Sequence, residues 1–207
     1  MSPRIFFIGD SFTHGTGDPE NLGWVGRVCA QAMTQGQDLT SYNLGIRGDT
    51  TQLIHQRWQA ETQCRIAETA GVGFVFSFGA NDVNLDDNTG QPRVRLTDSL
   101  IYAQKIFCQA QEIGPVLMIE SPPIADDSAA NQQLTELNQQ IADLCKTLTI
   151  PYIPTCAALL NNSVWMEEAI ANDGAHPRAR GYAALAKIIL NSKQWSQWLA
   201  QFYPANI

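Results

Sequence analysis

The chain has 207 residues, of which 44% are apolar and 16% charged, and its formal net charge is −7. This composition excludes wholesale disorder, and without any run of Lys or Arg a nucleic-acid partner is not expected, because phosphate binding needs clustered cations. Apolar runs such as Ile5 to Ile8 fall far short of the roughly 20 residues that cross a bilayer. We therefore expect one globular domain over residues 1–207, without a transmembrane segment.

Two further expectations follow from composition. A strand that begins by Arg4 or Ile5 leaves no room for a leader peptide, so we expect a cytoplasmic protein. The cysteines are odd in number, widely spaced and contain no CxxC pair, which predicts small reduced core residues without a zinc site or a disulfide framework. They are Cys29, Cys64, Cys108, Cys145 and Cys156. The oligomeric state is not readable from this pattern.

Short apolar runs rich in β-branched and aromatic residues predict five buried strands. In chain order these are Arg4 to Ile8, Ser41 to Leu44, Val72 to Phe78, Val116 to Glu120 and Pro151 to Pro154. Segments with helical spacing lie between them. Helices are expected over Trp24 to Met33, from Thr50 or Thr51 towards Glu68, over Leu96 to Ile113 and Leu134 to Leu148, and from Pro177 through Leu190.

This alternation of strands and helices predicts right-handed crossovers and a parallel sheet that is covered on both faces. Segments rich in Gly, Asn and Asp follow the carboxyl ends of several predicted strands. In open sheets of this kind the ligand site lies at that edge. We therefore look for chemistry in these segments.

Ser11 follows the first strand directly, in Gly9-Asp10-Ser11, and presents a hydroxyl just beyond the strand end. A nucleophilic hydroxyl needs a base and a group that orients the base. His176 stands three residues after Asp173, at the expected start of a helix, where one turn brings the two side chains together. Asp173 would fix the imidazole tautomer and favour the imidazolium, which predicts an upward shift of the His176 pKa. The alternative left open is an Asp173 that only caps the last helix.

The other two histidines have simpler interpretations. His14 is expected in a surface or loop-packing role, and His55 as a packing residue within a helix. Acyl transfer also needs donors for a developing oxyanion. Gly45 lacks a side chain that would obstruct its backbone N–H, and Asn81 can aim its amide into the same crevice, although each is also an ordinary turn residue.

Taken together, four blocks of the chain resemble the four sequence blocks of the SGNH hydrolases, which belong to the GDSL esterase and lipase superfamily. They occur along the chain in the same order as in that family. The blocks are Gly9-Asp10-Ser11-Phe12, Asn43-Leu44-Gly45-Ile46-Arg47-Gly48-Asp49, Gly79-Ala80-Asn81-Asp82 and Asp173-Gly174-Ala175-His176. The resemblance implies a flavodoxin-like three-layer α/β/α sandwich around the five-stranded parallel sheet. It also implies a serine esterase that acts on a small-molecule acyl ester, a thioester or an acetylated sugar, with no cofactor or metal.

The resemblance assigns roles to particular residues. Ser11 would be the nucleophile, His176 the general base and then acid, and Asp173 its partner. The oxyanion hole would consist of the N–H of Ser11, the N–H of Gly45 and the side-chain amide of Asn81. Phe12 departs from the family, which has leucine there, and this apolar exchange leaves the catalytic positions untouched.

Two alternative interpretations use the same residues. The loop from Ser11 to Gly17 is rich in hydroxyls and glycine, as are phosphate loops of flavin-binding domains, but Asp10, Asp18 and Glu20 would repel a phosphate. The chain could also be an inactive binding module of the same fold.

The segment from Asp82 to Asn88 alternates oxygen-bearing side chains as a calcium loop does, but Asp87 stands where the turn needs glycine and Arg93 where glutamate belongs. A solvated acidic loop is the favoured interpretation there. Arg47 is expected to pair with Asp49 or a neighbouring acid, with a role at the mouth of the site as the alternative.

Overall fold

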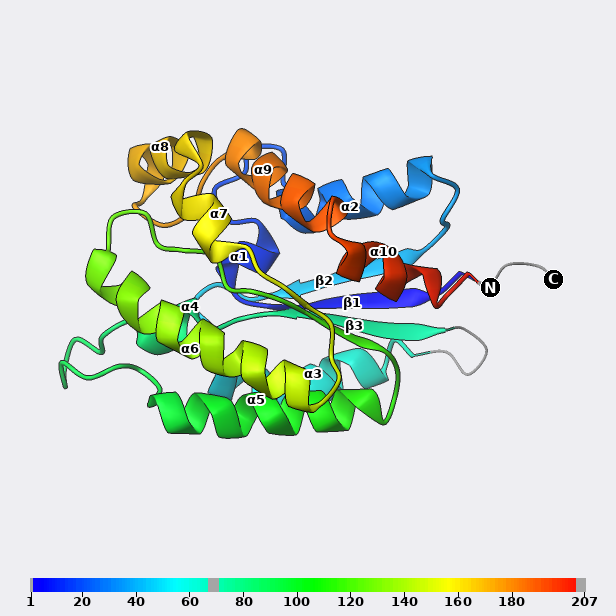
Figure 1. The fold of residues 1–207 in the computed structure, drawn as a ribbon, viewed down its shortest axis with the longest axis horizontal. Helices are drawn as coiled ribbons and strands as arrows, with labels where there is room; N and C mark the ends of the chain where they lie inside the picture. Colours follow the sequence, from blue (N-terminus) through cyan, green and yellow to red (C-terminus); the bar gives the residue numbers. More distant parts are fainter. Residues whose placement is uncertain (1, 67–70, 204–207) are drawn as a thin grey trace.

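The structure is a computed structural model that describes residues 2–66 and 71–203. Within these residues the chain forms a parallel sheet of five strands in the order β2-β1-β3-β4-β5 (Figure 1). The strands are β1 (Arg4–Gly9), β2 (Thr40–Gly45), β3 (Val72–Ser77), β4 (Val116–Ile119) and β5 (Tyr152–Ile153). This is the strand order of flavodoxin-like sheets, so the predicted fold is confirmed.

The central strands are apolar on both faces. In β1, Ile5, Phe6, Phe7 and Ile8 are all fully buried, and Phe6 stacks on Phe74 of β3 with ring centroids 5.6 Å apart. A continuous apolar run of this kind is typical of a parallel strand that helices cover on both sides. The core therefore lies along both faces of β1 and β3.

Helices cover the two faces and complete three layers (Figure 1). On one face lie α2 (Gly23–Thr34), α8 (Ser163–Asn172), α9 (Ala179–Leu190) and α10 (Lys193–Ala200), and on the other lie α3 (Thr51–Gln63), α5 (Leu96–Gln111) and α6 (Ser128–Thr147). Three short helices, α1 (Ser11–His14), α4 (Ala80–Val83) and α7 (Cys156–Leu160), follow β1, β3 and β5. The sequence did not predict these three, nor α8 and α10.

Three predicted helix boundaries are wrong. The helix predicted from Leu134 begins at Ser128, because the side chain of Asp127 caps it there. The helix after Thr50 ends at Gln63, and Glu68 lies outside the described residues. The last predicted helix begins at Ala179, two residues after Pro177, because a carboxylate oxygen of Glu168 accepts the N–H groups of Arg178 and Gly181. That side chain satisfies the free amides at the helix start and leaves Pro177 in the preceding loop.

The described residues contain no helix that combines the length and the apolar character of a membrane span. The cysteines are free thiols there, and Cys29, Cys145 and Cys156 are buried, as predicted. Cys64 and Cys108 are exposed, so the expectation that all five are core residues is wrong. Cys64 follows the last residue of α3, where its thiol donates to the backbone oxygen of Glu61 at 3.4 Å, and Cys108 stands on a solvent-facing position of α5.

Candidate active site

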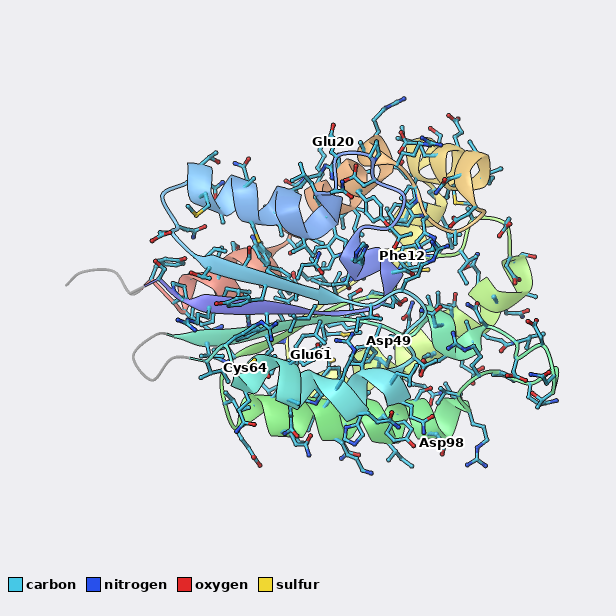
Figure 2. The ribbon with its side chains drawn as sticks, turned by 180° about the vertical axis from the view of Figure 1, so that it is seen from behind. Phe12, Glu20, Asp49, Glu61, Cys64 and Asp98 are labelled. Atoms are coloured by element: carbon cyan, nitrogen blue, oxygen red, sulfur yellow. The ribbon has the colours of Figure 1, made fainter. Side chains whose placement is uncertain are left out.

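The predicted site residues gather at the carboxyl ends of the strands. Figure 2 shows Phe12 and Asp49 at this end of the sheet and Cys64 near the opposite end. The order of the strands reverses between β1 and β3, because the chain leaves β1 for β2 and then returns past β1 to β3. Ligands of doubly wound sheets bind at such a reversal.

Ser11 is the first residue of α1, and the turn that presents it is fixed by Asp10. The Oδ1 atom of Asp10 accepts the N–H of Phe12 at 2.9 Å, which caps the short helix. Ser11 is itself 4% exposed. Since the first amides of a helix have no acceptor within it, the N–H of Ser11 has no intrahelical partner.

Ser11, His176 and Asp173 form one hydrogen-bonded chain. The Nε2 atom of His176 lies 2.7 Å from Oγ of Ser11, and its Nδ1 atom lies 2.8 Å from Oδ2 of Asp173. With the proton on Nδ1, the imidazole donates to the carboxylate and accepts from the hydroxyl. This arrangement lets the imidazole take the hydroxyl proton while the carboxylate holds the ring in place.

Asp173 and His176 do not lie in the first turn of a helix, which corrects the predicted local structure. Asp173 follows the last residue of α8, and its Oδ1 atom accepts the N–H groups of Ala175 at 3.2 Å and His176 at 2.8 Å. Gly174 has φ +83°, and a Cβ atom there would lie 1.9 Å from a carboxylate oxygen of Asp126. A tight turn that only glycine fits therefore joins the two side chains.

Burial lowers the pKa of the His176 imidazole below its usual value; the hydrogen bond and charge of Asp173 oppose this, and the charge of Arg47 adds to the lowering. The predicted upward shift is therefore wrong in its net direction. For Asp173, burial acts to raise the pKa, but hydrogen bonds from His176 outweigh it and lower the pKa of the carboxyl. At neutral pH the pair is thus a neutral imidazole beside a carboxylate.

The pH dependence of activity follows from these directions. A base must be uncharged to accept a proton, so kcat/KM is expected to fall on the acid side with a midpoint below the ordinary histidine value of about 6.5. Rates with a simple aryl ester, measured across the acid and neutral range, give this midpoint. A midpoint above about 7 would show that His176 in its present surroundings is not the titrating base.

Asn81, on α4, is tied to the loop that follows β2. Its Nδ2 atom donates to the backbone oxygen of Asp49 at 2.9 Å, which occupies one of the two amide hydrogens. The same loop reaches Asp173, because Nη2 of Arg47 lies 3.4 Å from Oδ2 of Asp173. The loop of residues 46–50 therefore connects Asn81 with the residues that face Ser11.

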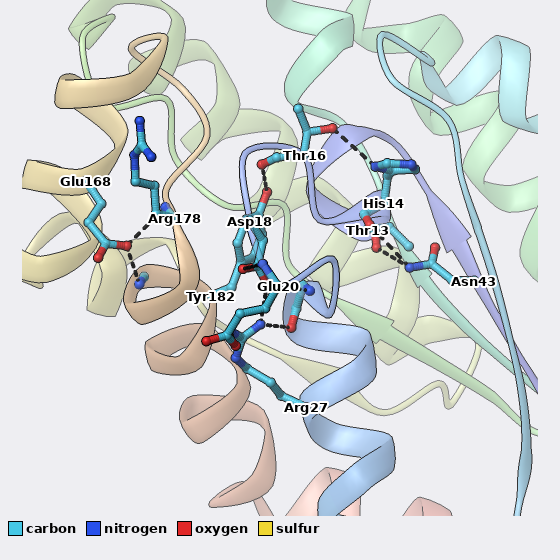
Figure 3. A network of polar contacts seen from close by, with 12 residues as sticks. Thr13, His14, Thr16, Asp18, Glu20, Arg27, Asn43, Glu168, Arg178 and Tyr182 are labelled. Atoms are coloured by element: carbon cyan, nitrogen blue, oxygen red, sulfur yellow. Dashed lines mark hydrogen bonds and ion pairs between the residues drawn. The ribbon is translucent and has the colours of Figure 1, made fainter.

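Gly45 does not offer the donor that the sequence predicted. Its N–H donates to Oδ1 of Asn43 at 3.0 Å. The amide of Asn43 in turn donates to the backbone oxygen of Thr13 at 2.9 Å, as Figure 3 shows. A backbone amide has a single hydrogen, so this one is already used. The missing side chain serves packing instead, since a Cβ atom at Gly45 would lie 2.2 Å from the backbone nitrogen of His14.

Gly48, three residues further on, was missed. It has φ +84°, nothing lies within 4 Å of the Cβ position that another residue would occupy, and its N–H has no acceptor among residues 2–66 and 71–203. The adjacent residue is Asp49, whose carbonyl holds Asn81. Gly48 thus combines a free amide, open space and a place beside the Asn81 side chain.

The loop after Ser11 is not arranged to hold a phosphate. The backbone amides of His14, Gly15 and Thr16 donate to carbonyl oxygens of Asp10 and Ser11 at 3.0 Å each. Phosphate cradles need such amides to point at the ligand. The predicted alternative of a flavin phosphate loop therefore lacks its donors.

The remaining candidates are accounted for by packing. His14 is exposed and its Nδ1 atom lies 3.5 Å from Oγ1 of Thr16, while the His55 ring packs on Tyr102 with centroids 5.4 Å apart. No group of three or more His, Cys, Asp or Glu side chains suited to a metal ion occurs in the described part of the chain.

Asp82 lies inside the protein, so the interpretation as a solvated acidic loop is wrong for this residue, whereas Asp87 and Asn88 of the same segment are exposed as predicted. Asp82 accepts the N–H of Thr51 at 2.7 Å and the hydroxyl of Ser99 at 2.6 Å, and it is 1% exposed. Burial raises the pKa of the Asp82 carboxyl, and burial raises that of Asp10 to about 7. The buried side chain of Asp82 therefore links α3 to α5 through hydrogen bonds.

Comparisons with known proteins show the family and the fold of the chain. The family model of the GDSL-like lipase/acylhydrolase family matches residues 7–184, and the chain belongs to this family, whose members are carboxylic ester hydrolases. A comparison with curated proteins finds no match.

Solved structures with the same fold include the lipase/acylhydrolase of Enterococcus faecalis, with TM-score 0.76 and 22% identity over 99% of this chain and 100% of that one. A lipolytic protein of the G-D-S-L family from Veillonella parvula has TM-score 0.71 and 21% identity over 93% and 98%. The acetylxylan esterase of Geobacillus stearothermophilus has TM-score 0.74 and 17% identity over 91% and 92%.

Proposed function

We propose that this protein is a serine esterase that hydrolyses carboxylic esters through an acyl-serine intermediate on Ser11. One observation carries the proposal: His176 contacts the hydroxyl of Ser11 at 2.7 Å and the carboxylate of Asp173 at 2.8 Å through its two ring nitrogens. A buried hydroxyl with an oriented, uncharged base is the arrangement that nucleophilic catalysis needs. The whole chain would act as one hydrolase domain.

In the first half of the reaction, Nε2 of His176 takes the proton of the Ser11 hydroxyl as Oγ attacks the ester carbonyl carbon. The tetrahedral intermediate collapses when His176 returns this proton to the leaving alcohol oxygen, and the acyl group stays on Ser11. In the second half, His176 takes a proton from water, the hydroxide attacks the acyl carbon, and the acid leaves as Oγ regains its proton. Asp173 stabilises the imidazolium in both halves.

The oxyanion hole would be formed by the N–H of Ser11, the N–H of Gly48 and the second hydrogen of the Asn81 amide. Gly48 takes the place that sequence reasoning gave to Gly45, because its N–H is free whereas that of Gly45 is bonded to Asn43. Donors held by a helix start and by hydrogen-bonded loops are oriented before the charge develops, so they stabilise it at little reorganisation cost.

A panel of aryl esters and thioesters of increasing acyl length, with acetylated sugars alongside, tests this function. We expect hydrolysis of the aryl esters without added metal or cofactor, and the order of the rates then identifies the substrate class. The acetylxylan esterase among the similar structures makes acetylated xylose oligomers a sensible member of the panel. A protein that hydrolyses none of these compounds, or that is yellow when purified, would favour the binding module or the flavin domain instead.

A further inference from the structure

Arg47 contacts the solvent-facing end of the hydrogen-bonded chain that Ser11, His176 and Asp173 form. It lies in the loop after β2, and its Nη2 atom is 3.4 Å from Oδ2 of Asp173, the same oxygen that accepts from Nδ1 of His176. The pairing with Asp49 that the sequence suggested does not form, because Asp49 pairs with Nε of Arg57 at 2.5 Å. The acid that Arg47 meets is thus the one that orients the catalytic base.

This contact joins two loops that carry different parts of the site. Asp173 is otherwise held by groups of its own turn, which are the amides of Ala175 and His176 and the Nδ1 atom of His176. Arg47 reaches it from the loop of residues 46–50, to which Asn81 is also bonded through the oxygen of Asp49. A change at Arg47 therefore acts on the hydrogen-bonded carboxylate without removing any group of the proposed mechanism.

We propose that Arg47 is a positioning residue which acts through Asp173: its guanidinium holds the outer side of that carboxylate and favours the uncharged form of His176. The inference rests on the proposed function, in which His176 must be uncharged to activate Ser11. A positive charge beside the carboxylate weakens the attraction between Asp173 and an imidazolium, and it also repels the imidazolium directly. Both effects extend activity towards lower pH.

The charged groups around His176 determine how strongly Arg47 favours the uncharged imidazole. The facing groups are Asp173 on its own loop, Arg47 across from it, and Ser11 on α1. Asp10 is buried at the start of α1, Asp126 lies against Gly174, and Asp18 is neutralised by its ion pair with Arg27. The Phe12 ring, with its centroid 5.0 Å from that of His176, carries no net charge. Arg47 is thus the cation that opposes Asp173 in the described surroundings.

The guanidinium is well exposed, with 67% of the side chain accessible, so its influence is moderated by solvent. Replacement Arg47→Gln is expected to move the acid midpoint of kcat/KM upward by about 0.3 to 0.8 pH unit. On the alkaline plateau, where His176 is uncharged in either protein, kcat and KM should each stay within about threefold of wild type. The shift should shrink in high salt, because exposed charges are screened.

Two matched variants separate charge from structure. Arg47→Lys keeps the charge and should retain the wild-type midpoint. Lys193→Gln changes the net charge by the same amount on α10, which lies near the opposite end of the sheet, and should not move the midpoint (Figure 1). A plateau that collapses in Arg47→Gln with an unchanged midpoint would assign a merely structural role and overturn the proposal.

A measurement without substrate keeps this inference separate from the function. The imidazole of His176 is titrated by NMR in wild type and in Arg47→Gln, with its signal assigned by comparison with His176→Gln. We expect the pKa of His176 to be higher in Arg47→Gln, whatever the protein hydrolyses. An unchanged pKa, or an equal rise in Lys193→Gln, would overturn the role of Arg47, whereas failure of the function itself would appear as activity that does not depend on Ser11.

Discussion

Replacing Ser11 by alanine is expected to lower kcat by roughly 10⁴- to 10⁶-fold, the loss that follows when a serine nucleophile is removed from an intact site. The substitution removes one oxygen atom, whose contact is the Nε2 atom of His176 at 2.7 Å. Because the cap of α1 is made by Asp10 and not by Ser11, the melting temperature should remain close to that of wild type. Steady-state rates with an aryl ester and thermal unfolding are measured on the same samples.

Ser196→Ala is the matched control, since this serine lies on α10 and its hydroxyl donates only to the backbone oxygen of Lys193. It should hydrolyse the ester at the wild-type rate. Activity of Ser11→Ala within about tenfold of wild type, with both variants folded, would exclude Ser11 as nucleophile because the remaining groups cannot supply an acyl-serine pathway.

Asn81→Ala is expected to lower kcat by roughly 10²- to 10³-fold with little change in KM, the effect of losing one oxyanion donor. Its second amide hydrogen acts only while charge builds on the carbonyl oxygen, so the ground state is hardly affected. Asn81→Asp should be at least as damaging. It is nearly the same size, but it turns an ionised acceptor towards the developing negative charge.

The structure adds a control, because Asn81 also holds the backbone of Asp49 at 2.9 Å and its loss loosens that loop. Asn138→Ala removes a comparable bond, from Nδ2 to the backbone oxygen of Ser121 at 3.2 Å, without removing an oxyanion donor. We expect Asn138→Ala to lower the melting temperature and to leave kcat close to that of wild type. If Asn81→Ala melts like wild type and keeps kcat within about threefold, a factor worth only about 0.65 kcal/mol, Asn81 is not an oxyanion donor.

The sheet could be read from the sequence because its strands are continuous apolar runs and its long helices show one-sided spacing. β1 and α5 are examples, and both begin where the pattern predicted them. The short helices could not be found this way. α1 has four residues, too few for a helical period, and it forms because Asp10 caps it.

Part of the site could be predicted because its chemistry is local or lies at a strand end. Ser11 lies just beyond β1, with only Asp10 between them, and Asp173 and His176 are close in sequence, so their contact needs only a turn. The distinction between Gly45 and Gly48 needed one more step. An Asn two residues before a backbone amide commonly accepts its hydrogen, and Asn43 does this to Gly45. That signal was present in the sequence.

Long-range pairings were beyond prediction. Asp82 is bonded to Thr51 and Ser99, and Arg47 meets Asp173, across separations that depend on how loops of different strands meet. From residue type alone, Asp82 was predicted to lie in a solvated acidic loop, and Arg47 was predicted to pair with Asp49 or a neighbouring acid. Burial of a carboxylate among hydrogen-bond donors is decided by the tertiary structure, which composition does not contain.

The most direct test of the account is covalent labelling with an organophosphonate, followed by peptide mass spectrometry. The phosphonate mimics the tetrahedral intermediate, so it reacts where a nucleophile, its base and the oxyanion donors meet. We expect one phosphonyl group per chain, on Oγ of Ser11, with loss of esterase activity in step with labelling and no label on Ser11→Ala. A label on another residue, or equal labelling of Ser11→Ala, would contradict the assignment of Ser11 as the nucleophile.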